Sequence, residues 1–165
     1  MALKVAVILG SDSDLPAMES CFKILKDFEV SYEAHIISAH RTPAQAEAFA
    51  STAKSKGFGV IIAAAGKAAH LAGVLAAYTP LPVIGVPMKT SMMGGLDSLL
   101  SMVQMPKGIP VACVAVDGGE NAGILAVQML ALQDAALAQK LVDFKARLAQ
   151  QVIEKDQKLQ EGQGK

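Results

Sequence analysis

Three short polar segments carry the side chains that could do chemistry, and each directly follows an apolar run. They are residues 10–14 (GSDSD), 38–42 (SAHRT) and 66–70 (GKAAH). The second segment places a hydroxyl, an imidazole and a guanidinium close together in the chain. A guanidinium pairs with phosphate through two parallel hydrogen bonds, and an imidazole titrates near neutral pH. The combination indicates a site that holds an anion and moves a proton.

The first segment suits a phosphorylated sugar. Ser11 and Ser13 supply hydroxyls, and the helix expected to follow them presents free N–H groups and its positive dipole end. The carboxylate of Asp14 would repel a phosphate, but it would suit a ribose diol. An alternative remains open, because an aspartate at a helix start can simply be an N-cap.

In the second segment, Ser38 and Arg41 are candidate anion ligands, and His40 is the candidate proton carrier. Thr42 and Pro43 have a local explanation, since threonine is a common N-cap and proline a common first residue of a helix. An isolated loop histidine is usually exposed or structural. The chemical interpretation of His40 therefore depends on the other two segments lying close to it.

The third segment consists of small residues that let a ligand lie against the backbone and form an apolar wall. Gly66, Ala68 and Leu71 are its candidate ligand contacts. A histidine at a helix start more often bonds to backbone than takes part in catalysis, but we include His70 as a second candidate catalytic residue. Residues 88–95 (MKTSMMGG) either cover such a pocket or pack in a subunit interface.

Five apolar runs rich in valine and isoleucine predict the strands that must position these segments. They are bounded by Gly, Pro, Ser or Asp, as is typical of parallel strands covered on both faces. The predicted strands are residues 4–9, 32–37, 59–65, 82–86 and 110–116. Apolar residues at helical spacing predict helices at 15–28, 43–56, 68–78, 95–105 and 121–155, the last as one bent helix or two.

Strand alternating with helix predicts an α/β fold. We expect a three-layer α/β/α sandwich around a doubly wound parallel sheet of about five strands, with a long C-terminal helical segment. In the flavodoxin-like order 2-1-3-4-5, the first three strands are neighbours. Their carboxyl ends would bring the three polar segments to one edge of the sheet, where such folds bind ligands.

Composition favours one compact domain. Of 165 residues, 52% are hydrophobic and 18% charged, so we expect a single catalytic domain over residues 1–155 and a polar, frayed tail over residues 156–165. Fifteen basic residues balance fifteen acidic ones, which disfavours nucleic acid as a partner. Mean hydropathy is +0.38, but Gly, Pro, Lys and His interrupt the longest apolar stretch, so no membrane span is expected. We expect a cytoplasmic protein whose surplus apolar surface is buried between subunits.

Several known motifs are missing from the sequence. It contains no GxSxG, no P-loop and no GxGxxG after the first strand, which disfavours a hydrolase elbow, P-loop nucleotide binding and a dinucleotide cofactor. It also lacks CxxC and closely spaced histidine pairs, so no metal site is predicted, and Cys21 and Cys113 are expected to be reduced. A small phosphorylated ligand and cofactor-free proton transfer remain.

At these residues the sequence resembles the 5-(carboxyamino)imidazole ribonucleotide mutase family, the small-subunit (class I) branch of phosphoribosylaminoimidazole carboxylases. The matching stretches run in order from residue 10 to residue 126: GSDSD, SAHRTP, AGKAAHLAG, TPLPVIGVP, GLDSLLSMVQMPKGIPVA and NAGILA. The chain departs from the family pattern at Lys67 and Ala72, where relatives often carry a small residue and a proline.

The resemblance implies an isomerase of purine biosynthesis. Such an enzyme moves a carboxylate from the exocyclic nitrogen of an aminoimidazole ribonucleotide to carbon 4 of the ring, by decarboxylation and recarboxylation. It implies that His40 shuttles the proton, that no metal or organic cofactor is used, and that the chain forms a homo-octamer.

The same resemblance implies roles for the substrate ligands. The phosphate and ribose ligands fall on Ser11, Asp14 and Arg41, with Ser13 and Ser38 adjacent to them. Gly66 and His70 line the carboxylate pocket, which Ala68 and Leu71 are expected to complete.

Two rival functions remain open. A related carboxylase adds free carbon dioxide directly to aminoimidazole ribonucleotide on the same fold, and its third loop has a polar Ser-Asn pair. This chain has Ala69 and His70 there, which favours the mutase. A non-catalytic, flavodoxin-like nucleotide-binding module would need the anion site but not His40.

Overall fold

The computed structural model describes residues 3–163, and the chain divides into two compact units, one up to Leu130 and one from Ala131 onward. The strands of the first unit are β1 (Lys4–Leu9), β2 (Tyr32–Ile36), β3 (Phe58–Ala65), β4 (Val83–Pro87) and β5 (Ala112–Cys113). The helices between them are α1 (Leu15–Asp27), α2 (Pro43–Ala53), α3 (Leu71–Tyr78), α4 (Leu96–Val103) and α5 (Gly119–Ala131).

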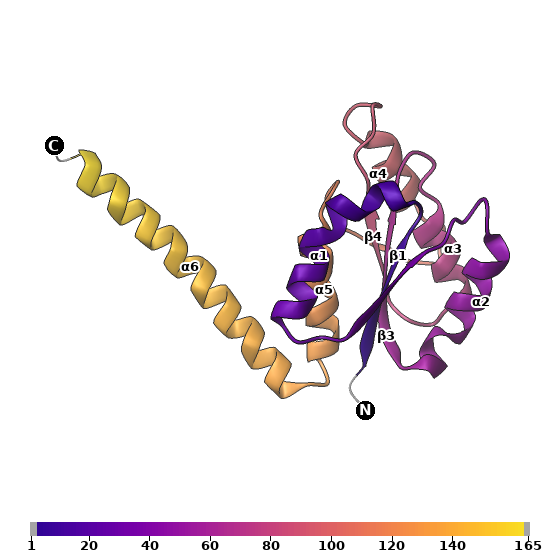
Figure 1. Cartoon of the computed structure of the whole chain (residues 1–165), viewed down its shortest axis with the longest axis horizontal. Helices are drawn as coiled ribbons and strands as arrows, with labels where there is room; N and C mark the ends of the chain where they lie inside the picture. The colour runs from indigo at the N-terminus through magenta and orange to yellow at the C-terminus, as the bar shows by residue number, and fades with distance from the viewer. Residues whose placement is uncertain (1–2, 164–165) are drawn as a thin grey trace. The chain divides into compact units, whose positions relative to one another are not determined.

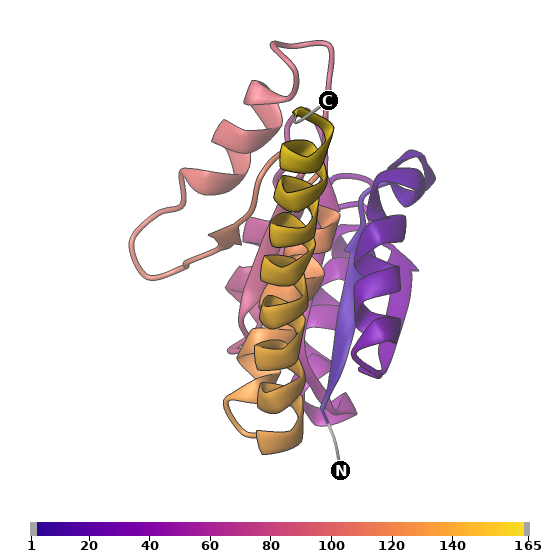
Figure 2. The same ribbon diagram turned by 90° about the vertical axis from the view of Figure 1, so that its left-hand side faces the viewer.

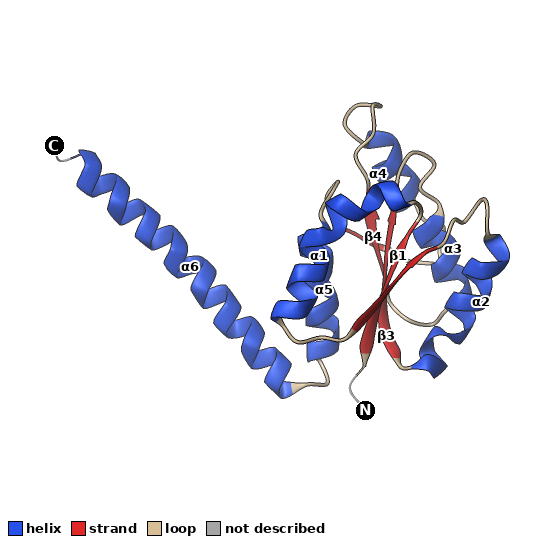
Figure 3. Cartoon of the chain, viewed as in Figure 1, coloured by secondary structure: helices blue, strands red, loops and turns tan. Residues whose placement is uncertain are grey.

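The five strands form one parallel sheet in the order β2-β1-β3-β4-β5, which confirms the predicted α/β fold and strand order. Helices α1 and α5 cover one face of the sheet, and α2 and α3 cover the other (Figure 1). Turned by a quarter, the unit shows α4 beside the short strand β5 at the far edge from α1 (Figure 2). All strands point the same way, so their carboxyl ends share one edge (Figure 3).

Apart from Lys4 at the start of β1, the central strands consist of apolar residues, and both of their faces are covered. In β1, Ala6 and Ile8 belong to the core cluster that includes residues of α2 and α3, whereas Val5, Val7 and Leu9 alternate with them and are also fully buried. Side chains of a strand point alternately to its two faces, so one continuous apolar run supplies both cores.

The expectation that every strand is buried was wrong for β2. Its residues Glu33 to Ile36 are exposed, and the Ile36 side chain keeps 54% of its surface accessible. The reason is position: β2 is the edge strand and pairs only with β1. The fifth strand is also shorter than predicted, two residues instead of seven, and is only half-buried.

Helices α1 and α5 pack closely through a glycine. A Cβ atom added at Gly123 would lie 3.0 Å from the Ile24 side chain and 3.2 Å from the Cys21 carbonyl oxygen. A residue with a Cβ atom would need Ile24 and the backbone at Cys21 to give by a few tenths of an ångström, so glycine allows the close approach of the two helices.

The last predicted helix is two helices. Residues 132–134 separate α5 from α6 (Ala135–Gln163), and the Asp134 carboxylate accepts a hydrogen bond of 3.0 Å from the Leu137 N–H, as an N-cap does. Helix α6 therefore includes residues 156–163 of the predicted tail, and residues 164–165 lie outside the described part. The expected domain boundary at residue 155 stays a prediction. None of the helices between residues 3 and 163 is both long enough and apolar enough to cross a membrane.

The buried centre of β3 gives a stability prediction. Ile62 is fully buried in the sheet, so Ile62→Ala should lower the free energy of unfolding by about 2–5 kcal/mol, measured by chemical denaturation. The matched Ile62→Val variant keeps most of the volume and should lose only about 0.5–1.5 kcal/mol. Equal losses in both variants would contradict the two-sided burial of this strand.

Candidate active site

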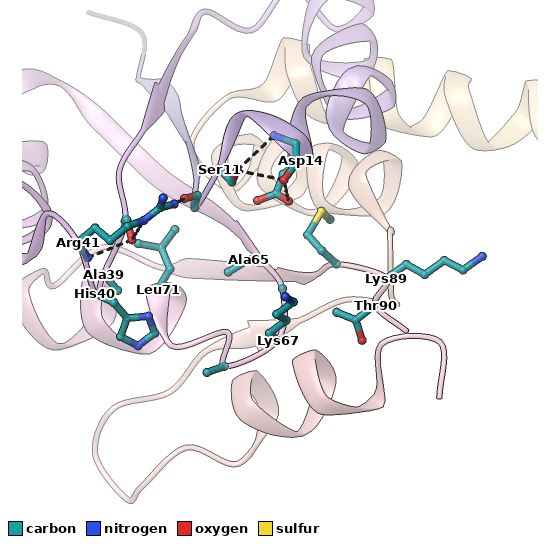
Figure 4. Close-up of a pocket in the computed structure, with 16 residues that line it drawn as sticks. Ser11, Asp14, Ala39, His40, Arg41, Ala65, Lys67, Leu71, Lys89 and Thr90 are labelled. Carbon is teal, nitrogen blue, oxygen red and sulfur yellow. Dashed lines mark hydrogen bonds between the residues drawn. The ribbon is translucent and has the colours of Figure 1, made fainter. Parts of the chain in front are cut away.

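A cavity of about 500 Å³ lies at the carboxyl edge of the sheet, where β1, β2, β3 and β4 end (Figure 4). Nine of the ten residues predicted from the sequence line it: Ser11, Ser13, Asp14, Ser38, His40, Arg41, Gly66, Ala68 and Leu71. The tenth, His70, is absent from the lining but contacts His40. The structure thus brings the three polar segments together, as the strand order predicted.

In the first loop the two serine hydroxyls lie side by side. The Ser13 hydroxyl donates to Ser11 Oγ at 3.0 Å, and the Ser11 hydroxyl donates to the Asp12 carboxylate at 3.0 Å. Residues Asp12–Asp14 form a short 3-10 turn that leads directly into α1. Both hydroxyls are thereby held beside the N-terminal end of a helix, where an anion is favoured.

Asp14 occupies the N-cap position of α1, but its side chain makes no capping hydrogen bond. It lines the cavity instead, beside Ser11 (Figure 4). The N-cap alternative raised by the sequence therefore does not account for this carboxylate.

Partial burial disfavours the charged form of Asp14. Desolvation raises the pKa of Asp14 above its ordinary value of 3.8, and the negative charges of Asp12 and Asp117 raise it slightly further. Hydrogen bonds with Ser11 and Ser13 lower the pKa but do not cancel the rise. A half-buried carboxylate with this environment is typical of a binding or catalytic group rather than of a solvated surface residue.

The second loop closes on itself through Thr42. The Ser38 N–H donates to Thr42 Oγ1 at 3.0 Å, and the Thr42 N–H and hydroxyl both donate to the Ser38 carbonyl oxygen, at 2.9 and 3.0 Å. Thr42 occupies the N-cap position of α2, as predicted, but its hydroxyl is used within the loop and makes no capping hydrogen bond. Pro43 is the first residue of α2, as predicted.

Arg41 connects the second loop to the first. Its Nε lies 3.5 Å from Ser38 Oγ, and its Nη2 lies 3.5 Å from the Gly10 carbonyl oxygen. Both contacts are long, and no described carboxylate forms an ion pair with Arg41. Its positive charge is therefore available to an anionic ligand in the cavity.

The two candidate catalytic histidines contact each other. His40 Nε2 lies 3.0 Å from His70 Nδ1, and the ring planes meet at 74°. A hydrogen bond at this distance requires a proton on one of the two nitrogens and a lone pair on the other. The His40 ring is therefore hydrogen-bonded to His70 in the free chain. A proton on either His40 Nε2 or His70 Nδ1 can be shared with the other nitrogen.

The third loop brings an apolar surface to the cavity. Ala65, Ala68 and Leu71 line it, and Leu71 lies next to His40 in Figure 4. Lys67, which also lines it, has a left-handed backbone with φ of +59°, an unusual conformation for a residue with a side chain.

Sequence reasoning did not assign a binding role to the fourth loop. Met88, Lys89 and Thr90 follow β4 and line the cavity. The signal was present, because β4 is the neighbour of β3 in the predicted order and its carboxyl end must lie at the same edge. Of the two alternatives for residues 88–95, the start of the segment forms a wall of the pocket, and Met92 and Met93 further on are exposed.

Neither a metal cluster nor a reactive thiol is found at this site. Within residues 3–163, no group of three or more His, Cys, Asp or Glu side chains could hold a metal ion. Burial raises the pKa of the Cys21 thiol to about 12, so this cysteine is held as an unreactive thiol away from the cavity.

The fold and the site define an α/β sandwich whose pocket at the carboxyl edge of the sheet combines hydroxyls, one guanidinium and a histidine pair. A family model described as AIR carboxylase matches residues 4–151. The chain belongs to the AIR carboxylase family.

Individual relatives agree with this assignment. The chain is 51% identical over 158 residues to the N5-carboxyaminoimidazole ribonucleotide mutase of Thermotoga maritima, covering 96% of this chain and 92% of the relative. It is 56% identical over 142 residues to the mutase of the same name from Pyrococcus abyssi, covering 86% and 82%. The crystal structure of Treponema denticola PurE matches with a TM-score of 0.86 at 29% identity, covering 94% of this chain and 97% of that one.

The raised pKa of Asp14 generates a pH-dependent prediction. The pKa of Asp14 is higher in the folded state than in the unfolded state, so the folded state binds the proton more tightly. As pH rises from 3.8 through the folded pKa, the wild type should therefore lose stability relative to Asp14→Asn, which has no proton to lose. At pH 7 the free Asp14→Asn protein should therefore melt at a higher temperature than the wild type. Below pH 3.8 this difference should disappear, as thermal unfolding across pH would measure.

The matched control is Asp27→Asn, which removes an exposed carboxylate at the end of α1. It should not show the same increase in melting temperature at pH 7. A wild type that is more stable than Asp14→Asn at pH 7 would contradict the unfavourable burial of this charge.

Proposed function

We propose that this chain is a mutase of purine biosynthesis. It converts 5-carboxyamino-1-(5-phospho-D-ribosyl)imidazole to 5-amino-1-(5-phospho-D-ribosyl)imidazole-4-carboxylate. The observation that carries this proposal is one pocket that joins a phosphate-suited loop, His40 and a guanidinium that pairs with no described carboxylate, in a chain about half identical to proteins named as this mutase.

The polar side of the pocket binds the ribose phosphate. Arg41 supplies the positive charge, and the hydroxyls of Ser11, Ser13 and Ser38 supply hydrogen bonds. Asp14 accepts hydrogen bonds from the ribose hydroxyls, which would offset the desolvation that disfavours the charged form of this half-buried carboxylate. These groups orient the imidazole ring toward the third loop.

The reaction needs one proton to move between two atoms of the substrate. Loss of carbon dioxide from the carbamate leaves a nitrogen that gains a proton, and attack of carbon 4 on carbon dioxide is followed by loss of the proton from that carbon. The two transfers cancel, so one imidazole suffices, and His40 performs both. His70, whose Nδ1 is 3.0 Å from His40 Nε2, holds the ring of His40 and shares its proton.

The apolar wall retains the intermediate. Carbon dioxide is small and carries no net charge, so it gains nothing from the polar side of the pocket. Gly66, Ala68 and Leu71 form a surface on which it can lie while the ring carbon attacks. No metal or organic cofactor enters this scheme.

We further propose a cytoplasmic homo-octamer. Large apolar side chains stay exposed on the single chain, at Ile36 of β2 and along α6 at Val142, Leu148, Val152 and Leu159. Surface of this kind is typical of residues that are covered by other subunits.

The second candidate is the direct carboxylase. The chain is also 51% identical over 156 residues to a Saccharomyces cerevisiae protein named phosphoribosylaminoimidazole carboxylase, although it covers only 27% of that longer protein. An assay that supplies either the carbamate substrate or aminoimidazole ribonucleotide with bicarbonate separates the two. We expect faster product formation from the carbamate, and preference for the second mixture would assign the chain to the carboxylase.

The proton-shuttle role predicts a specific defect. His40→Asn removes the titratable group, so turnover should fall by at least about 10²- to 10⁴-fold while ribonucleotide binding, measured by calorimetry, stays largely intact. His35→Asn on β2 is the matched control, since His35 lies near Glu33 and outside the pocket, and it should keep full turnover. Wild-type turnover in His40→Asn would remove His40 from the mechanism.

The phosphate role of Arg41 predicts a loss of affinity. Arg41→Ala should weaken ribonucleotide binding by about 10- to 100-fold, because it removes charge-assisted hydrogen bonds. The dephosphorylated nucleoside serves as the control ligand and should bind both proteins with the same low affinity. If the substitution weakened nucleoside binding equally, Arg41 would not be a phosphate ligand.

A further inference from the structure

The first turn of α4 is hydrogen-bonded to two loops of the pocket. The Lys67 N–H donates to Ser98 Oγ at 2.9 Å, and the Thr90 hydroxyl donates to the Asp97 carboxylate at 2.6 Å. Lys67 and Thr90 both line the cavity, whereas Ser98 and Asp97 do not. Helix α4 thus reaches the pocket through these two loops.

Ser98 is completely inaccessible to solvent, and no other polar or charged residue between residues 3 and 162 is buried. A buried hydroxyl is costly unless it is hydrogen-bonded, and this one accepts the backbone N–H of Lys67. The Ser101 hydroxyl, one turn further along α4, lies 3.3 Å from the Lys67 carbonyl oxygen. Both backbone groups of Lys67 therefore meet side chains of α4.

Lys67 needs this support because of its backbone conformation. Its φ of +59° lies in the left-handed region, which is unfavourable for any residue that carries a Cβ atom. Such a conformation persists where surrounding contacts hold it in place. Ser98 is the main contact of this kind, since its hydroxyl accepts the Lys67 N–H at 2.9 Å. Ser101 contributes less, because its hydroxyl donates chiefly to the Asp97 carbonyl oxygen at 2.7 Å.

Hydrogen bonds couple the backbone conformation of Lys67 to the position of His70. The Ala69 N–H donates to the Lys67 carbonyl oxygen at 2.8 Å, and the His70 N–H donates to the Ala68 carbonyl oxygen at 2.8 Å. Ala69 is itself fully buried in the core. Because the segment is hydrogen-bonded at both steps and buried at Ala69, it has little freedom, and a rotation at Lys67 would displace the His70 ring from His40.

We propose that Ser98 is a positioning residue: it holds Lys67 in the left-handed conformation and thereby places His70 against His40. The proposal rests on the catalytic role of His40 given above. Ser98 touches neither the ligand nor the reacting atoms, and its effect should appear in the chemical step rather than in binding of the ribose phosphate.

The test compares Ser98→Ala, Lys67→Gly and the double variant. Ser98→Ala should lower kcat about tenfold or more and change KM for the ribonucleotide less than about twofold, because the phosphate ligands lie on other loops. Glycine adopts a positive φ without steric cost, so Lys67→Gly should make the support unnecessary. The double variant should then recover most of the lost kcat, an effect that a purely structural serine would not show.

Controls separate loss of position from loss of fold. Ser51→Ala removes an exposed hydroxyl that bonds only within α2 and should leave kcat unchanged. If Ser98→Ala does not fold, Ser98→Cys keeps the size of the side chain with a weaker acceptor and should show a smaller loss of kcat, again recovered by Lys67→Gly. Full kcat in Ser98→Ala, or a loss of kcat that Lys67→Gly does not recover, would overturn the proposal.

Hydrogen exchange measures the same interaction without turnover. In peptides that cover residues 66–70, Ser98→Ala should speed amide exchange by about tenfold or more, because the Lys67 N–H loses its buried acceptor, and Ser51→Ala should not. If the wild type lacks mutase activity, the proposed function is refuted. The exchange measurement still tests the role of Ser98 in that case, because it does not depend on turnover. Unchanged exchange in Ser98→Ala would refute the positioning role.

Discussion

The pocket depends on one constraint, the level register of four parallel strands. Leu9 of β1 is paired with Ile36 of β2 on one side and with Ala64 of β3 on the other, and Ala65 is paired with Pro87 of β4. The chain therefore leaves these strands at nearly the same height. Loops that begin level at one edge can converge on a ligand without long connections, so a single sheet supplies the whole site.

Hydrogen bonds that already exist within the pocket determine how much free energy a ligand gains on binding. The Ser13 hydroxyl binds Ser11, the Ser11 hydroxyl binds Asp12, and Arg41 makes only long contacts to Ser38 and Gly10. A bound phosphate would replace these serine hydrogen bonds with hydrogen bonds to its own oxygens, so the number of bonds made by the serines would not increase. Its net gain would come mainly from the guanidinium, whose contacts in the free chain are weak.

The sequence was sufficient for features that depend on residue type and chain order. Alternating strands and helices predicted the sheet and its order, and polar residues after the first three strands predicted most of the pocket. Exposure of β2 was missed although the signals were present, because the predicted order already placed this strand at the edge and Tyr32–Ile36 carries Glu33 and His35, unlike the central strands. The extent of β5 was overestimated for a different reason, since an apolar run does not reveal how much of it pairs.

Contacts that depend on backbone conformation could not be predicted from residue types. His40 and His70 are thirty positions apart, and their contact requires the left-handed turn at Lys67, which no sequence pattern for lysine indicates. Thr42 shows the same limit on a smaller scale. Its type and place before proline correctly indicate the N-cap position, but its hydroxyl donates to the Ser38 carbonyl oxygen and makes no capping hydrogen bond.

The strand order also determines when the pocket can exist during folding. The only central neighbour of β1 in the sheet is β3, and the partners Val5 and Val60 are fifty-five positions apart. Parallel pairing across so long a stretch of chain must close a large loop before it gains stabilising contacts, and sheets of this kind form slowly. Since the loops of the site begin at the ends of these strands, no fragment that stops short of β3 can assemble the pocket. Only a chain in which β1 and β3 have already paired can therefore bind the ligand.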